Sequence, residues 1–152
     1  MLILEINKRK GGSMQILINK QTESKLSFNN ITPELLCEAR LFFDFTKTLK
    51  NCAGLAYNQV GGEKRFCAIF GKERIFMLNL QIIKYTGKIY KTIEHCLSFP
   101  NKDILATRND KVLVTFYNFL KRKSEVRTYG GYTAQIIQHE NEHLDGIIHK
   151  FK

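Results

Sequence analysis

The amino-acid sequence predicts an α+β fold with antiparallel or mixed β-sheets around one central helix. Apolar residues recur at helical spacing between residues 33 and 49. Short segments rich in β-branched and aromatic residues, which are typical of strands, follow between residues 66 and 129. A second helix-like stretch at residues 132–144 has two histidines four residues apart, which indicates a metal-bearing helix. Strands that surround such a helix give the α+β architecture.

Length and composition indicate a single domain over residues 1–152. A chain of 152 residues that is 43% apolar and 25% charged can bury a core without disulfide bonds. The run Lys10-Gly11-Gly12-Ser13 predicts a break, so we expect residues 1–13 to be a flexible N-terminal extension and Met14 to begin the compact part. No stretch resembles a membrane span or a signal peptide, which predicts a cytoplasmic protein with no membrane partner.

The first part of this domain is expected to hold a strand and a helix. Residues 15–18 have the apolar character of a short strand. Thr32 can cap a helix and Pro33 suits its first turn, with Glu34 near the positive end of the helix dipole. We therefore expect a helix over residues 33–49. Its buried face should carry Leu35, Leu36, Ala39, Phe42, Phe43, Thr46 and Leu49.

Most of the remaining chain is expected to form strands. The predicted strands are residues 66–70, 75–79, 81–85, 112–117 and 125–129. A polar turn at residues 121–124 should join the last two, and Gly130-Gly131 should separate them from the helix over residues 132–144. Gly146 is well placed just beyond the end of this helix, and residues 147–151 are expected to return as a final strand.

The segment His139-Glu140-Asn141-Glu142-His143 is the most informative part of the chain. Residues four apart lie on one face of a helix, so the imidazoles of His139 and His143 can reach one metal ion. Glu140 follows the first imidazole, where its carboxylate can accept a proton from water. This arrangement indicates metal-assisted hydrolysis. The alternative interpretation is a solvated polar face of a surface helix.

The motif leaves the third metal ligand open. His149 fits the longer pattern HExxHxxGxxH of metzincin metalloproteases, although no methionine for their Met-turn follows it. Cys96 is the upstream alternative, because a thiolate is a strong ligand for zinc or ferrous iron. A further segment, residues 52–61, has small residues that let backbone approach a substrate and carries Gln59, which can donate a hydrogen bond to an oxyanion.

Three segments in the same order resemble the motifs of peptide deformylase. The family carries GxGLAAxQ, EGCLS and QHExDHLxG, and this chain has CAGLAYNQ at residues 52–59, EHCLS at residues 94–98 and QHENEHLDG at residues 138–146. The resemblance extends from about residue 14 to the C-terminus and is to a short form that lacks a C-terminal helical extension. It implies removal of the N-formyl group from the initiator methionine of nascent peptides, with release of formate.

The resemblance also implies a role for each matching residue. The general acid/base implied is Glu140, and the donors that stabilise the oxyanion are Gln59 and the backbone N–H of Leu97. The metal implied is Fe(II), for which Zn, Ni or Co can substitute. The metal ligands implied are Cys96, His139 and His143.

Substrate binding is expected for three further residues. Gly54, with Ala53 beside it, corresponds to backbone that binds the substrate as an extended strand. His95 replaces the glycine of EGCLS, and its side chain should lie at the mouth of the cleft, where it can narrow the cleft or contact the peptide. It could compete as a metal ligand, but this is not expected, because adjacent side chains on an extended segment point apart. The metal ligands, Glu140 and Gln59 are all retained, which predicts an active enzyme. The other departures from the family pattern are Cys52, Tyr57, Asn58 and Glu142.

The net charge of +10 raises the question of nucleic-acid binding. The basic clusters Lys8-Arg9-Lys10 and Lys121-Arg122-Lys123 have no interleaved aromatic residues and belong to no recognised binding module, so DNA is not an expected partner. A basic surface would favour contact with the ribosome, where formylated nascent peptides emerge. A metzincin-like protease that uses His149 and a non-catalytic metal- or ribosome-binding protein remain the alternative functions.

Several residues are expected in supporting roles. Arg108 is expected to pair with Glu94 and so to brace the segment that carries Cys96. Either Glu142 or Asp145 is expected to orient a ligand imidazole through its free N–H. The cysteines expected in the core are Cys37 and Cys67.

Overall fold

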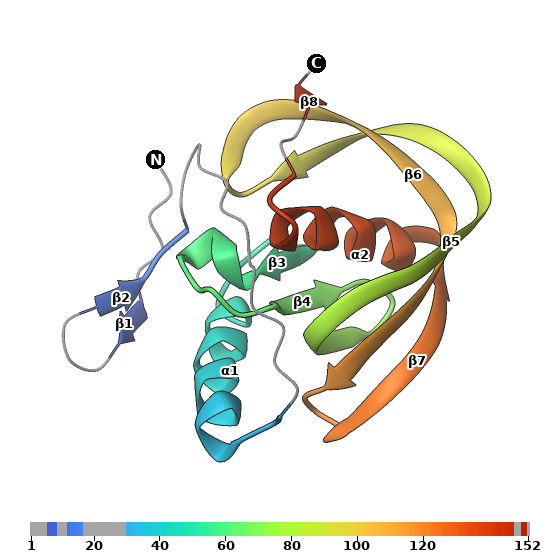
Figure 1. Cartoon of the computed structure of the whole chain (residues 1–152). Helices are drawn as coiled ribbons and strands as arrows, with labels where there is room; N and C mark the ends of the chain where they lie inside the picture. Colours follow the sequence, from blue (N-terminus) through green and yellow to red (C-terminus); the bar gives the residue numbers. More distant parts are fainter. Residues whose placement is uncertain (1–5, 9–11, 17–29, 148–149, 152) are drawn as a thin grey trace.

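The computed structural model describes residues 6–8, 12–16, 30–147 and 150–151 (Figure 1). Strands β3 to β7 form one antiparallel sheet in the order β3-β4-β5-β6-β7, β8 pairs with β6, and β1 and β2 form a separate hairpin. An antiparallel sheet with two helices confirms the predicted α+β fold. The elements are β1 (Ile6–Lys8), β2 (Gly12–Met14), α1 (Pro33–Thr46), β3 (Gly54–Ala56), the 3₁₀-helix η1 (Tyr57–Val60), β4 (Phe66–Phe70), β5 (Arg74–Cys96), β6 (Phe99–Asn118), β7 (Lys123–Gly130), α2 (Gly131–Leu144) and β8 (Lys150–Phe151).

The helices α1 and α2 lie on opposite sides of the short strands β3 and β4 (Figure 1). Alternate residues of β4 point to the two sides, because successive side chains of a strand face opposite ways. Phe66 and Ala68 pack in the aromatic cluster under α1, whereas Cys67 and Ile69 pack in the cluster under α2. A strand that is covered on both faces needs apolar residues throughout, which explains the unbroken run at residues 66–70.

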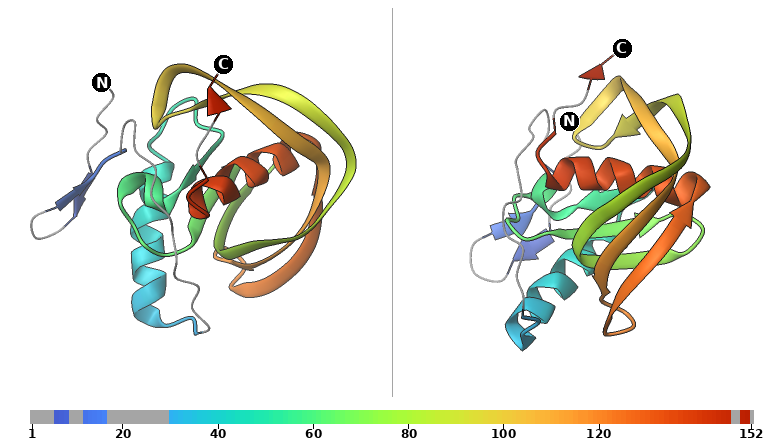
Figure 2. Two further views of the ribbon diagram at one scale, coloured as in Figure 1. Left: turned by 45° about the horizontal axis from the view of Figure 1, so that its top comes forward. Right: turned by 45° about the vertical axis from the view of Figure 1, so that its right-hand side comes forward.

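The strands β5 and β6 form a long ribbon that curls around α2 (Figure 2). The sequence predicted two short strands where the structure has the single strand β5. The pairing of β5 with β6 is interrupted by several register shifts and continues beyond each of them. One shift lies between Leu78 and Gln81, where Asn79 adopts a φ of +59°. A second irregularity lies at Gly87, where φ is +76° and a Cβ would be 2.9 Å from the Cβ of Asp110. These bulges bend the ribbon, and alternation alone does not predict them.

The helix α1 forms as the sequence predicts, with one difference in length. The hydroxyl of Thr32 accepts a hydrogen bond from the backbone N–H of Leu35 at 3.2 Å. The helix ends at Thr46, three residues before the predicted end at residue 49. Its buried face carries Leu35, Ala39, Phe42, Phe43, Phe45 and Thr46. Cys67 is buried as predicted, but the prediction for Cys37 is wrong, because this residue lies on the exposed side of α1.

The ends of the chain agree with the sequence predictions only in part. Gln15 and Ile16 belong to no strand, whereas residues 17–18 of the same predicted strand lie outside the described residues. Of the final strand expected over residues 147–151, Lys150–Phe151 forms β8, which pairs with Ile104 and Leu105 of β6. Ile147 belongs to no strand, and residues 148–149, which include His149, lie outside the described residues. Of the helices described, neither has the length and apolar character needed to cross a membrane.

Replacement of Phe43 by alanine tests the packing of α1. The Phe43 ring is buried and lies 4.5 Å from the Phe76 ring and 5.0 Å from the Phe119 ring, measured between centroids. We expect Phe43→Ala to lower the free energy of unfolding by about 3–5 kcal/mol, because it removes buried apolar surface and leaves a cavity. Urea unfolding measures this change. Leu41→Ala, on the exposed side of the same helix, is the control and should change stability by less than about 0.5 kcal/mol. Equal effects of the two changes would contradict the packing described for α1.

Candidate metal centre and active site

The helix α2 is buried along most of its length. Ten of its fourteen residues are buried, among them Gln138, His139, Glu140, Asn141 and His143. A solvated polar face would expose these side chains to water, so that interpretation of the motif is wrong. Buried polar groups need partners, and the partners that surround α2 define the site.

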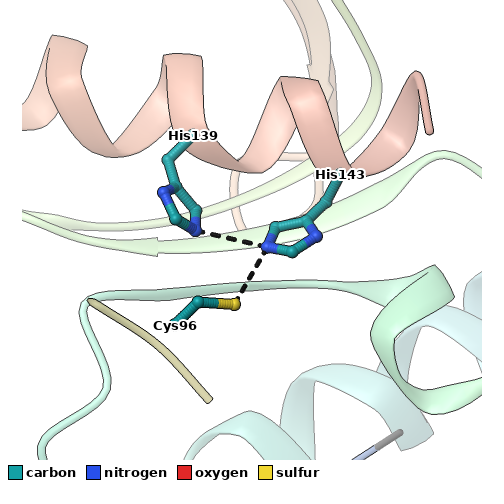
Figure 3. Close-up of side chains that lie close together, drawn as sticks. All are labelled: Cys96, His139 and His143. Atoms are coloured by element: carbon teal, nitrogen blue, oxygen red, sulfur yellow. Dashed lines mark hydrogen bonds between the residues drawn. The ribbon is translucent and has the colours of Figure 1, made fainter. Parts of the chain in front are cut away.

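The side chains of His139 and His143 from α2 and of Cys96 from β5 lie close together (Figure 3). The Nε2 atoms of His139 and His143 are 3.2 Å apart, and the Sγ of Cys96, at the end of β5, is 3.2 Å from Nε2 of His143. One possible ligand atom from each residue lies within 4.8 Å of the others. Two nitrogens that each bind a tetrahedral ion at about 2.1 Å are about 3.4 Å apart. The spacing therefore fits one metal ion with a thiolate and two imidazole ligands.

A buried ion-pair network holds His139. The guanidinium of Arg108 on β6 donates to both carboxylate oxygens of Glu94 on β5, at 2.8 Å and 2.7 Å. Oε2 of Glu94 is also 2.7 Å from Nδ1 of His139, and Arg108 donates to Glu142 at 2.6 Å. The contact with Glu94 fixes the His139 ring with Nε2 toward Cys96. The expected pair of Arg108 and Glu94 is thus present.

The network also sets the charge of the site. Burial alone would raise the pKa of Glu94, but the hydrogen bonds from Arg108 and His139 lower it to about 2, so this carboxylate is ionised. Burial alone would lower the pKa of His139, but hydrogen bonds with Cys96 and Glu94 raise it to about 10. A site that raises the pKa of an imidazole favours positive charge, and a divalent metal ion would supply that charge.

Glu140 lies beside the three ligand candidates and differs from Glu94 in its environment. Burial raises its pKa to about 7, and His139 only partly opposes this effect. Its Oε2 atom is buried and has no hydrogen-bond partner among the described residues. Leaving a buried carboxylate oxygen without a partner is costly, so we infer that a bound group, such as water or substrate, completes its contacts.

Gln59 is held in one orientation by its neighbours. Its Oε1 accepts from the backbone N–H of Ala56 at 2.9 Å, which leaves Nε2 to donate toward the site. Nε2 is 3.0 Å from Oγ of Ser98 and 3.5 Å from Sγ of Cys96. An amide N–H is therefore fixed beside the candidate ligands, where a developing negative charge could be stabilised.

A cleft of about 780 Å³ opens beside these groups. Gly54 of β3 is one of the residues that line the cleft. A Cβ at this position would be 2.8 Å from Oε1 of Glu140, which is too close. The helix α2 can therefore approach β3 this closely only because the strand has a glycine here. His95 also lines the cleft, with an exposed ring, and does not belong to the cluster of candidate ligands. His143 is not among the lining residues. The site residues that line the cleft are Ala53, Gly54, Gln59, His95, Cys96, Leu97, His139 and Glu140.

Four contacts of the site were not predicted from the sequence. Glu94 contacts the imidazole of His139, a role that the sequence assigned to Glu142 or Asp145. Asp145 instead accepts from Arg65 at 2.8 Å, and Arg65 also donates to Asn141 at 3.1 Å. The fourth contact, from Asn58 to the backbone oxygen of His143, lies at the same end of α2. In the sequence, only the departure of Asn58 from the family pattern pointed to one of these contacts.

Comparison with known proteins supports the resemblance to peptide deformylase that the sequence motifs indicated. A sequence profile described as Polypeptide deformylase matches residues 20–150. The peptide deformylase of Clostridium beijerinckii is 40% identical over 103 residues, which cover 66% of this chain and 72% of the relative. That of Desulforudis audaxviator is 32% identical over 130 residues, which cover 83% and 82%. The crystal structure of a probable peptide deformylase from synechococcus phage S-SSM7 has 26% identity and a TM-score of 0.73, covering 90% of this chain and 97% of that chain.

Replacement of Cys96 tests the metal site. Protein loaded with Zn(II) and then dialysed is expected to retain about one ion per chain, as the donor set predicts. Cys96→Ser should weaken metal binding by more than about tenfold, because a hydroxyl is a poorer zinc ligand than a thiolate. Elemental analysis against a series of chelator concentrations measures the change. Cys37→Ser, at the exposed cysteine of α1, is the control. Unchanged metal binding in Cys96→Ser would instead point to His149 as the third ligand.

Replacement of Arg108 tests the buried network. Arg108→Met leaves the Glu94 carboxylate buried without its guanidinium, so we expect a loss of about 3–5 kcal/mol in the free energy of unfolding. Arg127→Met removes a half-exposed ion pair with Glu73 on the surface and should cost less than about 1 kcal/mol. Chemical denaturation of both variants at equal metal loading makes the comparison. Similar losses would mean that the buried pair has no special role in holding the fold.

Proposed function

The chain belongs to the polypeptide deformylase family, and we propose that its cleft hydrolyses the N-formyl group of nascent peptides. The observation that carries this proposal is the buried carboxylate oxygen of Glu140, which has no hydrogen-bond partner among the residues that the structure describes, beside a cluster of one cysteine and two histidines. Peptide deformylases are metalloenzymes, and the donor set of this chain fits a divalent ion. We propose Fe(II) as the native ion, with Zn, Ni or Co able to substitute, because thiolate and imidazole ligands suit each of them.

Cys96, His139 and His143 would hold the metal ion, which would supply a positive charge and lower the pKa of a water beside it. Glu140 is placed to accept a proton from that water, and a pKa of about 7 lets it release the proton again near neutral pH. The water oxygen bonds to the formyl carbon, and the carbon–nitrogen bond then breaks. Glu140 passes its proton to the leaving amine, so the products are formate and a free N-terminus.

Gln59 and Leu97 are proposed to stabilise the oxyanion of this reaction. The Nε2 donor of Gln59 points toward Cys96, and the backbone of Leu97 follows Cys96 directly on the cleft wall. Donors that are fixed before the reaction need no reorganisation when charge develops. Each such donor contributes about 3 kcal/mol of transition-state stabilisation in enzymes of comparable chemistry.

The substrate is proposed to bind as an extended strand. The strand β3 lies at an edge of the described sheet, and its Gly54 and the neighbouring Ala53 face the cleft. A peptide can add to a free edge through backbone hydrogen bonds, which requires no particular side chain. His95 at the cleft mouth is proposed to contact the residues that follow formyl-methionine.

The proposed setting is the cytoplasm, at the ribosome. The chain has a net charge of +10, which favours residence near ribosomal RNA. The cluster Lys121-Arg122-Lys123 in the β6–β7 turn is exposed, although Lys121 lies 3.5 Å from Glu125. We propose neither DNA nor a membrane as a partner.

Formate release from formyl-Met-Ala-Ser by the Fe(II)- or Ni(II)-loaded protein, prepared without oxygen, tests the function. We expect Glu140→Gln to lower kcat by about 10²–10⁴-fold with metal retained, because it removes the group that transfers protons. Glu73→Gln, at a half-exposed surface carboxylate, should have wild-type activity. If wild type and Glu140→Gln bind metal but neither releases formate, the proposal fails. Activity that survives Cys96→Ser would favour the metzincin-like alternative.

A further inference from the structure

The outer rim of the cleft is built by an irregular segment of β6 where it pairs with β5. Cys96 pairs with Phe99, and the next pair is Glu94 with Ile104, so the four residues 100–103 lie opposite the single residue His95. Asn101 in this segment adopts a left-handed φ of +62°. The segment forms one side of the cleft with Pro100, Asn101 and Asp103.

A polar pair joins this segment to β5. Nε2 of His95 is 3.0 Å from Oδ1 of Asp103, and both side chains are largely exposed, at 75% and 53%. The neighbours of His95 on β5, Glu94 and Cys96, are buried, so the His95 side chain points outward, as alternation along a strand requires. His95 thus holds the carboxylate of Asp103 at the cleft rim rather than at the metal cluster.

The lining of the cleft differs from the rest of the protein in its charged side chains. The sequence has 24 lysines and arginines, yet neither type occurs among the described residues that line the cleft. Its carboxylates are Glu94, Asp103 and Glu140. Glu94 is engaged by Arg108 and His139, and Glu140 is buried near the cluster. Asp103 is therefore the carboxylate that a substrate side chain can reach at the rim.

We propose that Asp103, oriented by His95, selects formylated peptides with a lysine or arginine in the second or third position. This inference rests on the proposed deformylation, in which formyl-methionine occupies the inner cleft and the following residues extend past the rim. Residues of an extended peptide advance by about 3.3 Å each, so the second and third side chains come within reach of a carboxylate near the cleft mouth. A cationic side chain there would meet Asp103 with no lysine or arginine of the cleft lining to compete for it.

The proposal is tested with peptides that differ only in charge. The substrates are formyl-Met-Lys-Ser and formyl-Met-Glu-Ser for the second position, and formyl-Met-Ala-Lys and formyl-Met-Ala-Glu for the third. For wild type we expect kcat/KM to favour the lysine peptide at one position at least, by about two- to fivefold, the range of an exposed ion pair. The preference should shrink in 0.5 M salt because of screening.

Two substitutions locate the effect. Asp103→Asn should abolish the lysine preference, measured as the ratio of kcat/KM for the lysine and glutamate peptides, and His95→Ala should reduce this ratio in part. Asp44→Asn is the matched control, since Asp44 is 59% exposed on α1, away from the cleft. Equal rates for lysine and glutamate peptides in wild type, or a preference that persists in Asp103→Asn, would overturn the proposal.

The same design separates this inference from the proposed function. Absence of hydrolysis of formyl-Met-Ala-Ser by the metal-loaded wild type means that the deformylase proposal fails. The charge selection is then decided by binding of the unformylated peptides Met-Ala-Lys and Met-Ala-Glu, and of Met-Lys-Ser and Met-Glu-Ser, measured by calorimetry or NMR titration. Tighter binding of a lysine peptide that is lost in Asp103→Asn supports the inference, and equal binding within both pairs overturns it.

Discussion

The buried Arg108 side chain is the constraint on which the site depends. Its guanidinium connects Glu94 of β5 and Glu142 of α2 to its own strand β6, so three elements share one charged group. Bringing these charges out of water is costly, and only complete pairing offsets that cost. The geometry of Arg108 therefore fixes the distance between α2 and the ribbon, and with it the position of His139 relative to Cys96. The arrangement of the candidate metal ligands follows from this network and is not an independent feature of α2.

The sequence predicted those parts of the molecule that local patterns determine. The ends of α2 and the i, i+4 relation of His139 and His143 follow from helical periodicity. The helix α1 follows from its cap at Thr32 and its apolar spacing. The unbroken apolar run of β4 predicted a strand, though not that α1 and α2 would cover its two faces. The association of Cys96, Gln59 and Glu140 came from the order of three motifs, since spacing alone left His149 as an alternative.

What the sequence did not predict depends on contacts between distant segments. Glu94 is 45 residues from His139, and no local pattern chooses it over Glu142 on α2 or Asp145 just after the helix. The length of β5 was missed because bulges at Asn79 and Gly87 interrupt the alternation on which strand prediction rests. Cys37 was assigned to the core by residue type, although its place on α1, two residues after buried Leu35, is on the exposed side.

The contact of Gly54 with α2 links the candidate metal ligands to the strand edge at which the substrate is proposed to bind. A Cβ at Gly54 would lie 2.8 Å from both Oε1 of Glu140 and Cγ2 of Ile136, so any larger residue would push α2 away from β3. A peptide that pairs with the edge of β3 would therefore bring its N-terminal group beside Glu140 without movement of either element. The inner cleft then selects a substrate by this backbone geometry, whereas the rim at Asp103 can select only by charge. Changes at the rim should consequently alter which peptides are preferred and leave the chemical step intact.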